Sequence, residues 1–257
     1  MQRKVSQNEL ANRQEFSSKG KTNYFSAYND GVVHASFWQE VVNLHIRSTA
    51  FEKLENPCII DAGGGGGRIA QKFKQTFPLA RVELLDINPD MLKFAHEANG
   101  ISKKNVHISD VIEMRYGGTS TKQGSLVPSD SVDHVISNSV LWILDEPELF
   151  FKEVYRVLKK GGRVSVASGT PDFNLSEKRE TFIAQIQKDM DKAVSNGAIS
   201  LETAKIILDA NRNITANMNS LLTKEQAIQL GQSNGLKCLD QSKAYVDMFF
   251  FLVFEKS

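Results

Sequence analysis

Residues 57–73 read PCIIDAGGGGGRIAQKF, and this stretch decides the fold of the chain. A short apolar run ends at Asp61, five consecutive glycines follow, and a segment with helical spacing begins at Arg68. Because glycine has no Cβ atom, the backbone N–H groups of such a turn can approach a ligand closely. The stretch therefore predicts a strand, a tight turn and a helix start that together form a ligand site in an α/β protein.

Strand and helix patterns alternate after this stretch at the spacing of βαβ units. Strands are predicted near residues 58–61, 81–87, 106–110, 132–137, 159–168, 237–246 and 248–255. Between residues 171 and 220 the alternation is interrupted by two segments with helical spacing. The sequence thus predicts an α/β sheet with a helical insertion after its fifth strand.

Two flanking segments are expected to shape the ligand site. We predict that residues 1–50 form a leading helical or lid segment, and that residues 51–257 form one domain with a helical cap at about 171–220. An aromatic-rich loop containing Tyr24 and Tyr28 is expected before a helical region at 35–54. These tyrosines either close over a ligand or anchor the segment to the core. The insertion either shapes a substrate pocket or thickens the helical layer.

Composition and charge favour a small-molecule partner. The chain has 31 Lys and Arg against 30 Asp and Glu, so no global field attracts nucleic acid or an acidic membrane. Its longest apolar run, at 248–254, is far shorter than the roughly 20 residues of a membrane span. The polar N-terminus lacks a signal peptide pattern. Cys58 and Cys238 have no metal-like spacing and indicate free thiols, so we expect a cytoplasmic protein that holds no metal.

Two cofactors compete for the glycine stretch. Gly65, Gly67 and Ala70 satisfy the dinucleotide pattern G-x-G-x-x-[GA], and Asp86 follows at about the distance of a ribose-binding acid. That pattern favours an NAD(P)-dependent oxidoreductase on a Rossmann-type sheet. Five glycines in a row satisfy many templates, however, and the acid that precedes them supports a different cofactor.

The acid and its glycines resemble those of class I S-adenosylmethionine-dependent methyltransferases of the small-molecule type. Asp61, at the end of the first predicted strand, is followed by Gly63, Gly65 and Gly67 in the family's acid and G-x-G-x-G arrangement. The run from the fourth strand to the KKGG turn at 159–162 is similar as well. The resemblance covers roughly residues 58–167, with weaker agreement over 222–254.

The resemblance implies how S-adenosylmethionine is held. Asp86 matches the acid that accepts hydrogen bonds from both ribose hydroxyls, and Asp110 matches the acid near the adenine amine. Met91 matches an apolar residue beside the adenine, and Asn138 lies where the family contacts the methionine end. The implied cofactor-binding residues are Asp61, Gly63, Gly65, Gly67, Asp86, Ile87, Met91, Asp110, Val111 and Asn138.

The resemblance also implies the fold and the activity. The fold would be α/β with a doubly wound, Rossmann-like, seven-stranded sheet, mostly parallel with an antiparallel last strand. The activity would be in-line methyl transfer from S-adenosylmethionine to a small-molecule acceptor, with S-adenosylhomocysteine as product. The alternatives are the oxidoreductase described above and a non-catalytic, cofactor-binding interaction module.

Residues for the chemical step are weakly indicated. An activated methyl donor makes a dedicated catalytic side chain optional, and His34 is the candidate base if the nucleophile starts protonated. His107 and His134 lie in predicted strands and are interpreted as structural. Tyr24, Tyr28 and Trp142 are the candidate substrate contacts, although Trp142 after a core strand is equally explained by packing. The acceptor molecule is not indicated by any motif.

Overall fold

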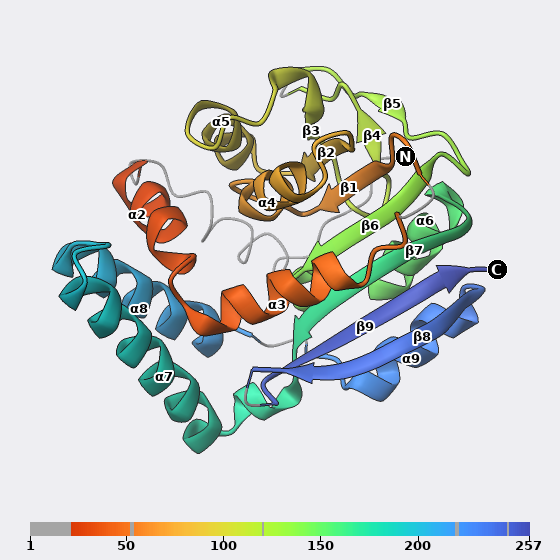
Figure 1. The fold of residues 1–257 in the computed structure, drawn as a ribbon. Helices are drawn as coiled ribbons and strands as arrows, with labels where there is room; N and C mark the ends of the chain where they lie inside the picture. Colours follow the sequence, from red (N-terminus) through yellow and green to blue (C-terminus); the bar gives the residue numbers. More distant parts are fainter. Residues whose placement is uncertain (1–21, 52–53, 120, 219–220, 246) are drawn as a thin grey trace.

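A seven-stranded sheet runs through the centre of the molecule (Figure 1), in the order β3-β2-β1-β6-β7-β9-β8. The structure is a computed structural model that describes residues 22–51, 54–119, 121–218, 221–245 and 247–257. The strands of this sheet are β1 (Cys58–Ala62), β2 (Arg81–Asp86), β3 (Val106–Ile108), β6 (Val132–Asn138), β7 (Leu158–Gly169), β8 (Leu236–Ala244) and β9 (Phe249–Lys256). A separate hairpin pairs β4 (Arg115–Tyr116) with β5 (Ser125–Leu126).

Helices cover both faces of the sheet and extend beyond one edge of it. The α-helices are α2 (Thr22–Val32), α3 (Ser36–Arg47), α4 (Arg68–Thr76), α5 (Pro89–Glu97), α6 (Pro147–Val157), α7 (Ser176–Ser195), α8 (Leu201–Ala216) and α9 (Lys224–Ser233). Three short 3₁₀ turns accompany them in the described part of the chain: η1 (Lys103–Asn105), η2 (Leu141–Ile143) and η3 (Pro171–Asn174).

The sheet has the predicted strand directions. β1 pairs in parallel with β2 and β6, β2 with β3, and β6 with β7. The last strand, β9, lies antiparallel between β7 and β8. The mostly parallel sheet with an antiparallel last strand is confirmed. Because parallel strands end at the same edge, the residues that follow β1, β2, β3 and β6 meet there.

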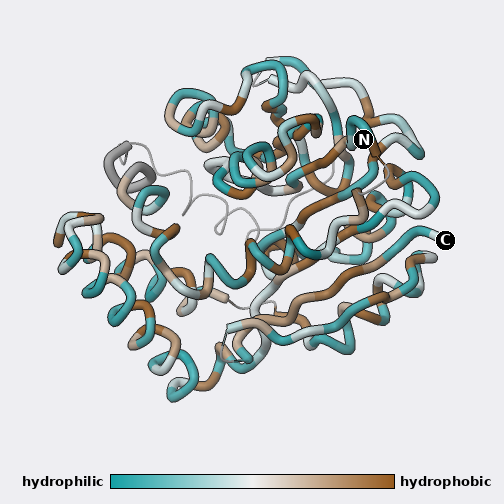
Figure 2. Tube along the Cα trace, viewed as in Figure 1, coloured by the Kyte–Doolittle hydropathy of each residue, from teal (hydrophilic) through white to brown (hydrophobic). Residues whose placement is uncertain are grey.

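Alternation along the strands places side chains on two buried faces. In β1, Ile59 packs in the cluster formed with α3, α4 and α5, whereas Ile60 packs in the cluster formed with α6 and α9. In β9, Phe251 faces the first side and Phe254 the second. Figure 2 shows the resulting band of hydrophobic residues through the central strands. A strand that is buried on both faces is apolar throughout, as the sequence of β9 predicts.

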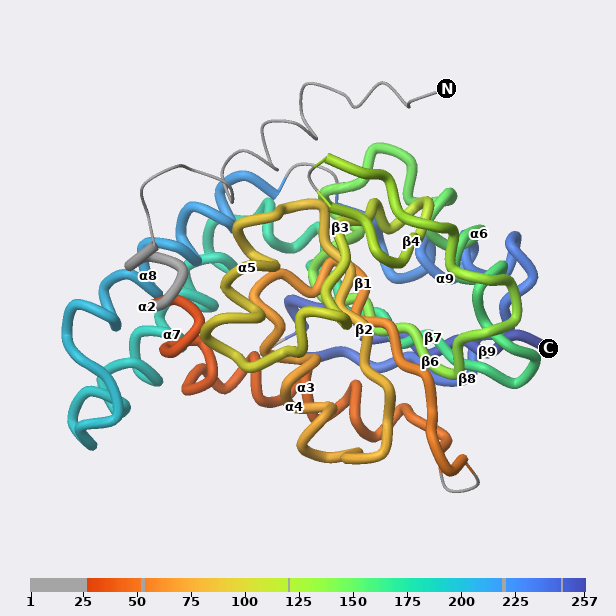
Figure 3. Tube along the Cα trace, turned by 90° about the horizontal axis from the view of Figure 1, so that it is seen from above, coloured from red at the N-terminus to blue at the C-terminus, as the bar shows by residue number. Residues whose placement is uncertain are grey.

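The insertion after β7 forms a helical cap. α7 and α8 pack together, and α2 from the leading segment lies along α8 (Figures 1 and 3). At Gly31 the two helices approach so closely that a Cβ atom would lie 2.6 Å from Ile207 Cγ1. The prediction of an aromatic-rich loop is therefore wrong for residues 22–32, because these residues form α2. Packing on α8 stabilises this helix.

Some expectations lie outside this description. Of the predicted leading segment, residues 1–21 are outside the described residues. In the region at 35–54 that was predicted to be helical, the helix ends at Arg47. In the part of the chain that the structure describes, no helix has the length and apolar character needed to cross a membrane.

Candidate active site

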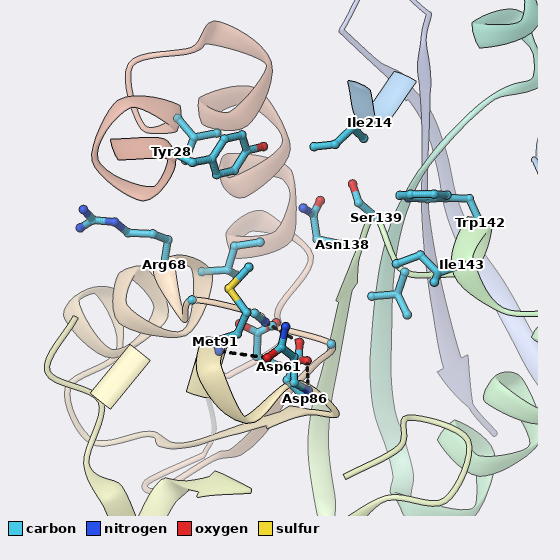
Figure 4. Close-up of a pocket in the computed structure, with 18 of the residues that line it drawn as sticks. Tyr28, Asp61, Arg68, Asp86, Met91, Asn138, Ser139, Trp142, Ile143 and Ile214 are labelled. Atoms are coloured by element: carbon cyan, nitrogen blue, oxygen red, sulfur yellow. Dashed lines mark hydrogen bonds between the residues drawn. The ribbon is translucent and has the colours of Figure 1, made fainter. Parts of the chain in front are cut away.

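A cavity of about 320 Å³ opens at the carboxyl edge of the sheet. Its floor comes from the turns after β1, β2, β3 and β6, and its other walls come from α2, α3, η2, α8 and the start of β9. Figure 4 shows two acids, Asp61 and Asp86, close together on one side of it, with Trp142, Ile143 and Ile214 across from them. The cavity thus has an acidic side next to the glycine turn and an apolar side next to the cap.

The glycine turn joins β1 to α4, and Gly63, Gly65 and Gly67 all have a left-handed φ. Gly65 has φ of 51° and lines the cavity, and no atom lies within 4 Å of where its Cβ would be. Gly67 has φ of 78° and is the N-cap of α4. A Cβ on Gly67 would lie 3.0 Å from that of Ala95, so this glycine permits close packing on α5. Both φ angles favour glycine. Of Gly65 and Gly67, only Gly65 lines the cavity.

Asp61 is the next-to-last residue of β1, and its carboxyl group is buried. Its Oδ2 accepts a hydrogen bond from the backbone N–H of Ala70 at 3.1 Å, in the first turn of α4. Burial raises the pKa of Asp61 to about 7, and the nearby negative charge of Asp86 adds to the effect. A cation beside Asp61 would favour its ionised form. The position suits a positively charged ligand group.

Asp86 ends β2 and is held by two backbone N–H groups. Its Oδ2 accepts from Gly65 N–H at 2.8 Å, and its Oδ1 accepts from Asn88 N–H at 2.8 Å. The side chain is half-buried and lines the cavity. Asn88 in turn caps α5 by accepting hydrogen bonds from Asp90 N–H and Met91 N–H. The backbone therefore fixes the orientation of the Asp86 carboxylate at the cavity wall.

The remaining predicted cofactor residues extend this wall. Ile87, Met91, Asp110 and Val111 all line the cavity, and Asp110 Oδ1 accepts from Ile112 N–H at 3.3 Å. Gly63 also lines it, with its N–H donated to Leu85 O of the neighbouring strand. The structure thus brings the ends of the first three parallel strands to one surface.

The turn after β6 forms the boundary between the two sides. Asn138 and Ser139 line the cavity, and Ser139 adopts a left-handed φ of 58° that is uncommon for serine. Trp142, from η2, also lines the cavity and is 3% exposed. Trp142 belongs to the apolar cluster under the cap and also forms part of the cavity wall, and its contact with a substrate stays a prediction.

Two predicted residues are not among the described residues that line the cavity. Gly67 is buried under α5, as described above, and His34 lies in the turn between α2 and α3, where its N–H donates to Gly31 O. Tyr24 belongs to α2, but its side chain is outside the described residues. Tyr28, one turn later, does line the cavity, and its ring is drawn in Figure 4.

The strand histidines have structural partners. Ser165 Oγ lies 2.7 Å from His45 Nδ1 and 2.9 Å from His134 Nε2, so one buried hydroxyl joins two imidazoles beneath α3. Burial lowers the pKa of both histidines to about 3. His107 Nε2 pairs with Glu83 Oε2 at 2.9 Å. None of these three rings lines the cavity.

The sequence analysis missed a polar connection between α2 and the glycine turn. Asn29 and Asn99 exchange side-chain hydrogen bonds at 2.9 and 3.3 Å, and Asn99 Nδ2 also donates to Gly66 O. Arg68 donates to Asn29 O and to the carboxylate of Asp30 at 2.6 Å. Asn29 and Arg68 line the cavity. No spacing rule connects residues seventy positions apart, so only the fold could identify this contact.

The sequence analysis also missed most of the apolar side. Phe37 and Trp38 of α3, Ile214 of α8, Met218 just after it and Phe249 of β9 all line the cavity. Their helical or strand periodicity indicated only burial.

Comparison with known proteins places the central part of the chain in a known domain family. A family model described as a methyltransferase domain matches residues 60–166. A malonyl-[acyl-carrier protein] O-methyltransferase from Hahella chejuensis (strain KCTC 2396) is 33% identical over 106 residues, which are 41% of this chain and 34% of that relative. Including two relatives of the same name from Ilyobacter polytropus, the matched part spans 34% to 55% of the relatives' length.

Solved structures have the same fold at low sequence identity. A magnesium protoporphyrin IX methyltransferase from Synechocystis PCC 6803 with bound SAM superposes with a TM-score of 0.61 at 14% identity, covering 100% of both chains. A geranyl diphosphate C-methyltransferase from Streptomyces coelicolor A3(2), in complex with Mg²⁺, geranyl diphosphate and S-adenosyl-L-homocysteine, gives 0.56 at 12% identity over 84% of this chain and 78% of that one. At these identities the likeness shows the fold alone.

Proposed function

Because the chain carries a class I S-adenosylmethionine-dependent methyltransferase domain, we propose that the protein transfers the methyl group of S-adenosylmethionine to a small-molecule acceptor and releases S-adenosylhomocysteine. One observation carries the proposal: Asp61, Asp86 and Asp110, which lie at or just beyond the carboxyl ends of three neighbouring parallel strands, line one cavity together with the glycine turn. Such a surface offers several acceptors and closely approachable backbone, which suits a cofactor with hydroxyls, an amine and an ammonium group.

The residues at the acidic side fit this cofactor. Asp86, oriented by two backbone N–H groups, is the acceptor for the ribose hydroxyls. Asp110 is the acceptor for the adenine amine, with Val111, Ile87 and Met91 as the apolar surface beside the base. Gly65 supports the fit, because its Cβ position is open and the backbone there can be approached without steric obstruction.

Asp61 fits the amino acid end of the cofactor. Its carboxyl group is buried and has a pKa raised to about 7, so the cavity by itself stabilises the negative charge poorly. The ammonium group of S-adenosylmethionine would stabilise the ionised form. Asn138, at the end of β6, supplies an amide near the same end. The chain's own residues thus provide acceptors for the ribose hydroxyls, the adenine amine and the ammonium group of the cofactor.

The transfer itself depends on positioning. When bound, S-adenosylmethionine supplies a methyl group on a positively charged sulfur, which an acceptor nucleophile takes in line. The chain's part is to hold the acceptor against that methyl group and to exclude water, which accounts for much of the rate in such displacements. The walls from α2, α8 and η2 provide that enclosure.

Calorimetric titration tests the cofactor assignment. We expect the protein to bind S-adenosylhomocysteine and not NADH, because three acids lie beside the glycine turn and Arg68, the cationic side chain among the described lining residues, is paired with Asp30. Binding of NADH with no binding of S-adenosylhomocysteine would support the oxidoreductase instead. Incubation with methyl-labelled S-adenosylmethionine and candidate acceptors, followed by extraction of labelled product, then tests the transfer.

A further inference from the structure

One face of α8 presents polar side chains to the cavity among apolar ones. Asn211, Ile214 and Thr215 of this helix line the cavity, and residues three and four positions apart lie on the same helix face. Figure 4 shows Ile214 across the cavity from Asp61 and Asp86. Asn211 and Thr215 therefore belong to the apolar side of the cavity, away from the acids assigned to the cofactor.

Asn211 is a buried amide that the packing of the cap does not require. It is 4% exposed, and its buried neighbours on the helix include Ile207, Leu208 and Ala210. Asparagine is an unfavourable residue in the interior of a helix. Among the described residues, its side chain bonds only to Ile207 O, to which Nδ2 donates at 2.8 Å. This bond lies within one helix, so the amide does not tie α8 to another element.

The remaining atom of this amide is an acceptor. Because a carbonyl oxygen cannot donate, the atom bonded to Ile207 O is Nδ2 and the other one is Oδ1. Oδ1 has no hydrogen bond in the described part of the chain, and it is not among the fully enclosed polar atoms that lack a partner. Since Asn211 is otherwise buried, the accessible surface of Oδ1 faces the cavity that the residue lines.

The donors on this face of α8 are both used within the helix. Thr215 Oγ1 donates to Asn211 O at 2.8 Å, and Asn211 Nδ2 donates to Ile207 O. The described lining residues of α8 thus offer the cavity oxygen lone pairs and no N–H or O–H group. An acceptor in such a place is unfavourable until it receives a hydrogen bond, and a ligand with a donor group supplies one.

We propose that the methyl acceptor carries a hydroxyl or N–H group and that Asn211 recognises this group through Oδ1. The inference rests on the proposed function, since it places the cofactor on the acidic side and the acceptor on the apolar side. Asn211 is then a specificity-determining residue. Its bond to Ile207 O fixes the plane of the amide, so Oδ1 is oriented before the acceptor binds. The rest of the acceptor packs on apolar lining residues such as Trp38 and Phe249.

Equilibrium dialysis with two probes of similar shape tests the proposal. The probes are 2-naphthol, which carries a hydroxyl donor, and 2-methoxynaphthalene, which keeps the rings and the oxygen but has no donor. The protein is saturated with S-adenosylhomocysteine, so that only the apolar side is open to them. We expect 2-naphthol to bind this complex, and no detectable binding of 2-naphthol would overturn the inference.

One substitution removes the acceptor atom and keeps a branched side chain. Asn211→Leu should lower the ratio of the 2-naphthol affinity to the 2-methoxynaphthalene affinity by about tenfold, a difference of about 1.4 kcal/mol. Asn213→Leu is the matched control, because Asn213 is exposed on the same helix and does not line the cavity. Its ratio should match that of the wild type within about twofold. No fall in Asn211→Leu, or an equal fall in both variants, would overturn the role of Oδ1.

Thermal unfolding separates recognition from a structural role. Because a residue kept for recognition is not needed by the fold, ligand-free Asn211→Leu should melt no lower than the wild type. A lower melting temperature with an unchanged ratio of affinities would assign Asn211 to the structure and overturn the inference. If the larger leucine prevents folding, Asn211→Ala decides the question, since alanine is smaller and favours helix. It should show the same tenfold fall in the ratio, and an unchanged ratio would overturn the inference.

The same titrations separate this inference from the proposed function. If S-adenosylhomocysteine does not bind the wild-type protein, the proposed function is contradicted. If it binds but the ratio does not depend on Asn211, only the inference fails. The affinity of S-adenosylhomocysteine for Asn211→Leu, expected to match that of the wild type within about twofold, shows that the variant is folded and that its acidic side is intact.

Discussion

Asp61 retains its proton to higher pH than an exposed aspartate because its carboxyl group is buried at the end of β1. The folded pKa of about 7 lies above the ordinary value of 3.8. Between these two values the folded protein binds more protons than the unfolded chain, so stability falls as pH rises through this range. The residue therefore makes the ligand-free protein less stable near neutral pH than in mild acid.

Asp61→Asn should remove this dependence. The variant keeps an acceptor for Ala70 N–H without carrying a charge. We expect it to be more stable than the wild type at pH 8, by on the order of 4 kcal/mol for a shift of about three pKa units. At pH 4 the two should be nearly equal. Urea unfolding of both ligand-free proteins at the two pH values measures the difference, and an equal difference at both would contradict the assignment.

Asp86→Ala should weaken cofactor binding. The change removes a charged acceptor assigned to two hydroxyls, so we expect a loss of roughly 2–4 kcal/mol in the affinity for S-adenosylhomocysteine. Asp90→Ala is the matched control, because Asp90 is exposed on the following helix and does not line the cavity. Calorimetric titration of a folded Asp86→Ala protein with unchanged affinity would contradict the assignment.

At the scale of elements, the cap depends on how α2 lies on α8. Gly31 of α2 faces Ile207 of α8, and a Cβ atom there would lie 2.6 and 2.9 Å from two atoms of that buried side chain. α2 carries Tyr28 and Asn29 into the cavity, so its distance from α8 sets the position of both. A change at this contact should therefore alter stability and ligand binding together.

Gly31→Ala should lower the melting temperature although alanine favours helix by about 1 kcal/mol over glycine. The added methyl group needs space that Ile207 occupies. Adding Ile207→Val to Gly31→Ala should recover part of the lost stability. A double-mutant cycle, which compares the two single variants with the double variant, measures this recovery. A Gly31→Ala protein that melts higher than the wild type would show that the helices separate without cost.

The start of α3 is held by another element of the cap. Asp189 of α7 accepts from the N–H and the hydroxyl of Ser36 at 2.7 and 2.6 Å. Asp189→Ala should cost about 1–2 kcal/mol of unfolding free energy, as loss of a helix cap does. Asp191→Ala should cost little, because Asp191 is exposed and accepts only from Gln187 of the same helix among the hydrogen bonds described. Equal effects in denaturant unfolding would argue against this capping role.

At the scale of the molecule, the ligand joins parts that are distant in the chain. The cavity is lined from α2, the ends of β1, β2 and β3, and the cap. Binding at one hundred times the dissociation constant should stabilise the protein by about 2.7 kcal/mol. We expect S-adenosylhomocysteine to slow hydrogen exchange in α2 and in the turns after these strands. Exchange in α9, which contributes no described lining residue, should change little; uniform protection would contradict a local site.

The acidic side of the site was predictable because it is encoded locally. Asp61, Asp86 and Asp110 each follow a short apolar strand, and the parallel alternation of strands and helices brings such ends to one edge. The glycine pattern marks the same edge. The role of Gly67 was less accessible, since its spacing matches a cofactor glycine while its buried position next to Ala95 is a matter of helix packing.

What the sequence determined by itself was therefore the succession of strands and helices along the chain and the acids at the strand ends, because the two-residue and 3.6-residue periods are local properties. What only the tertiary structure decided was the apolar side: Trp38, Ile214 and Phe249 lie far apart in the chain and meet only because α2 packs on α8 above the sheet. Such contacts depend on which buried faces pack against each other, and no local pattern specifies that choice.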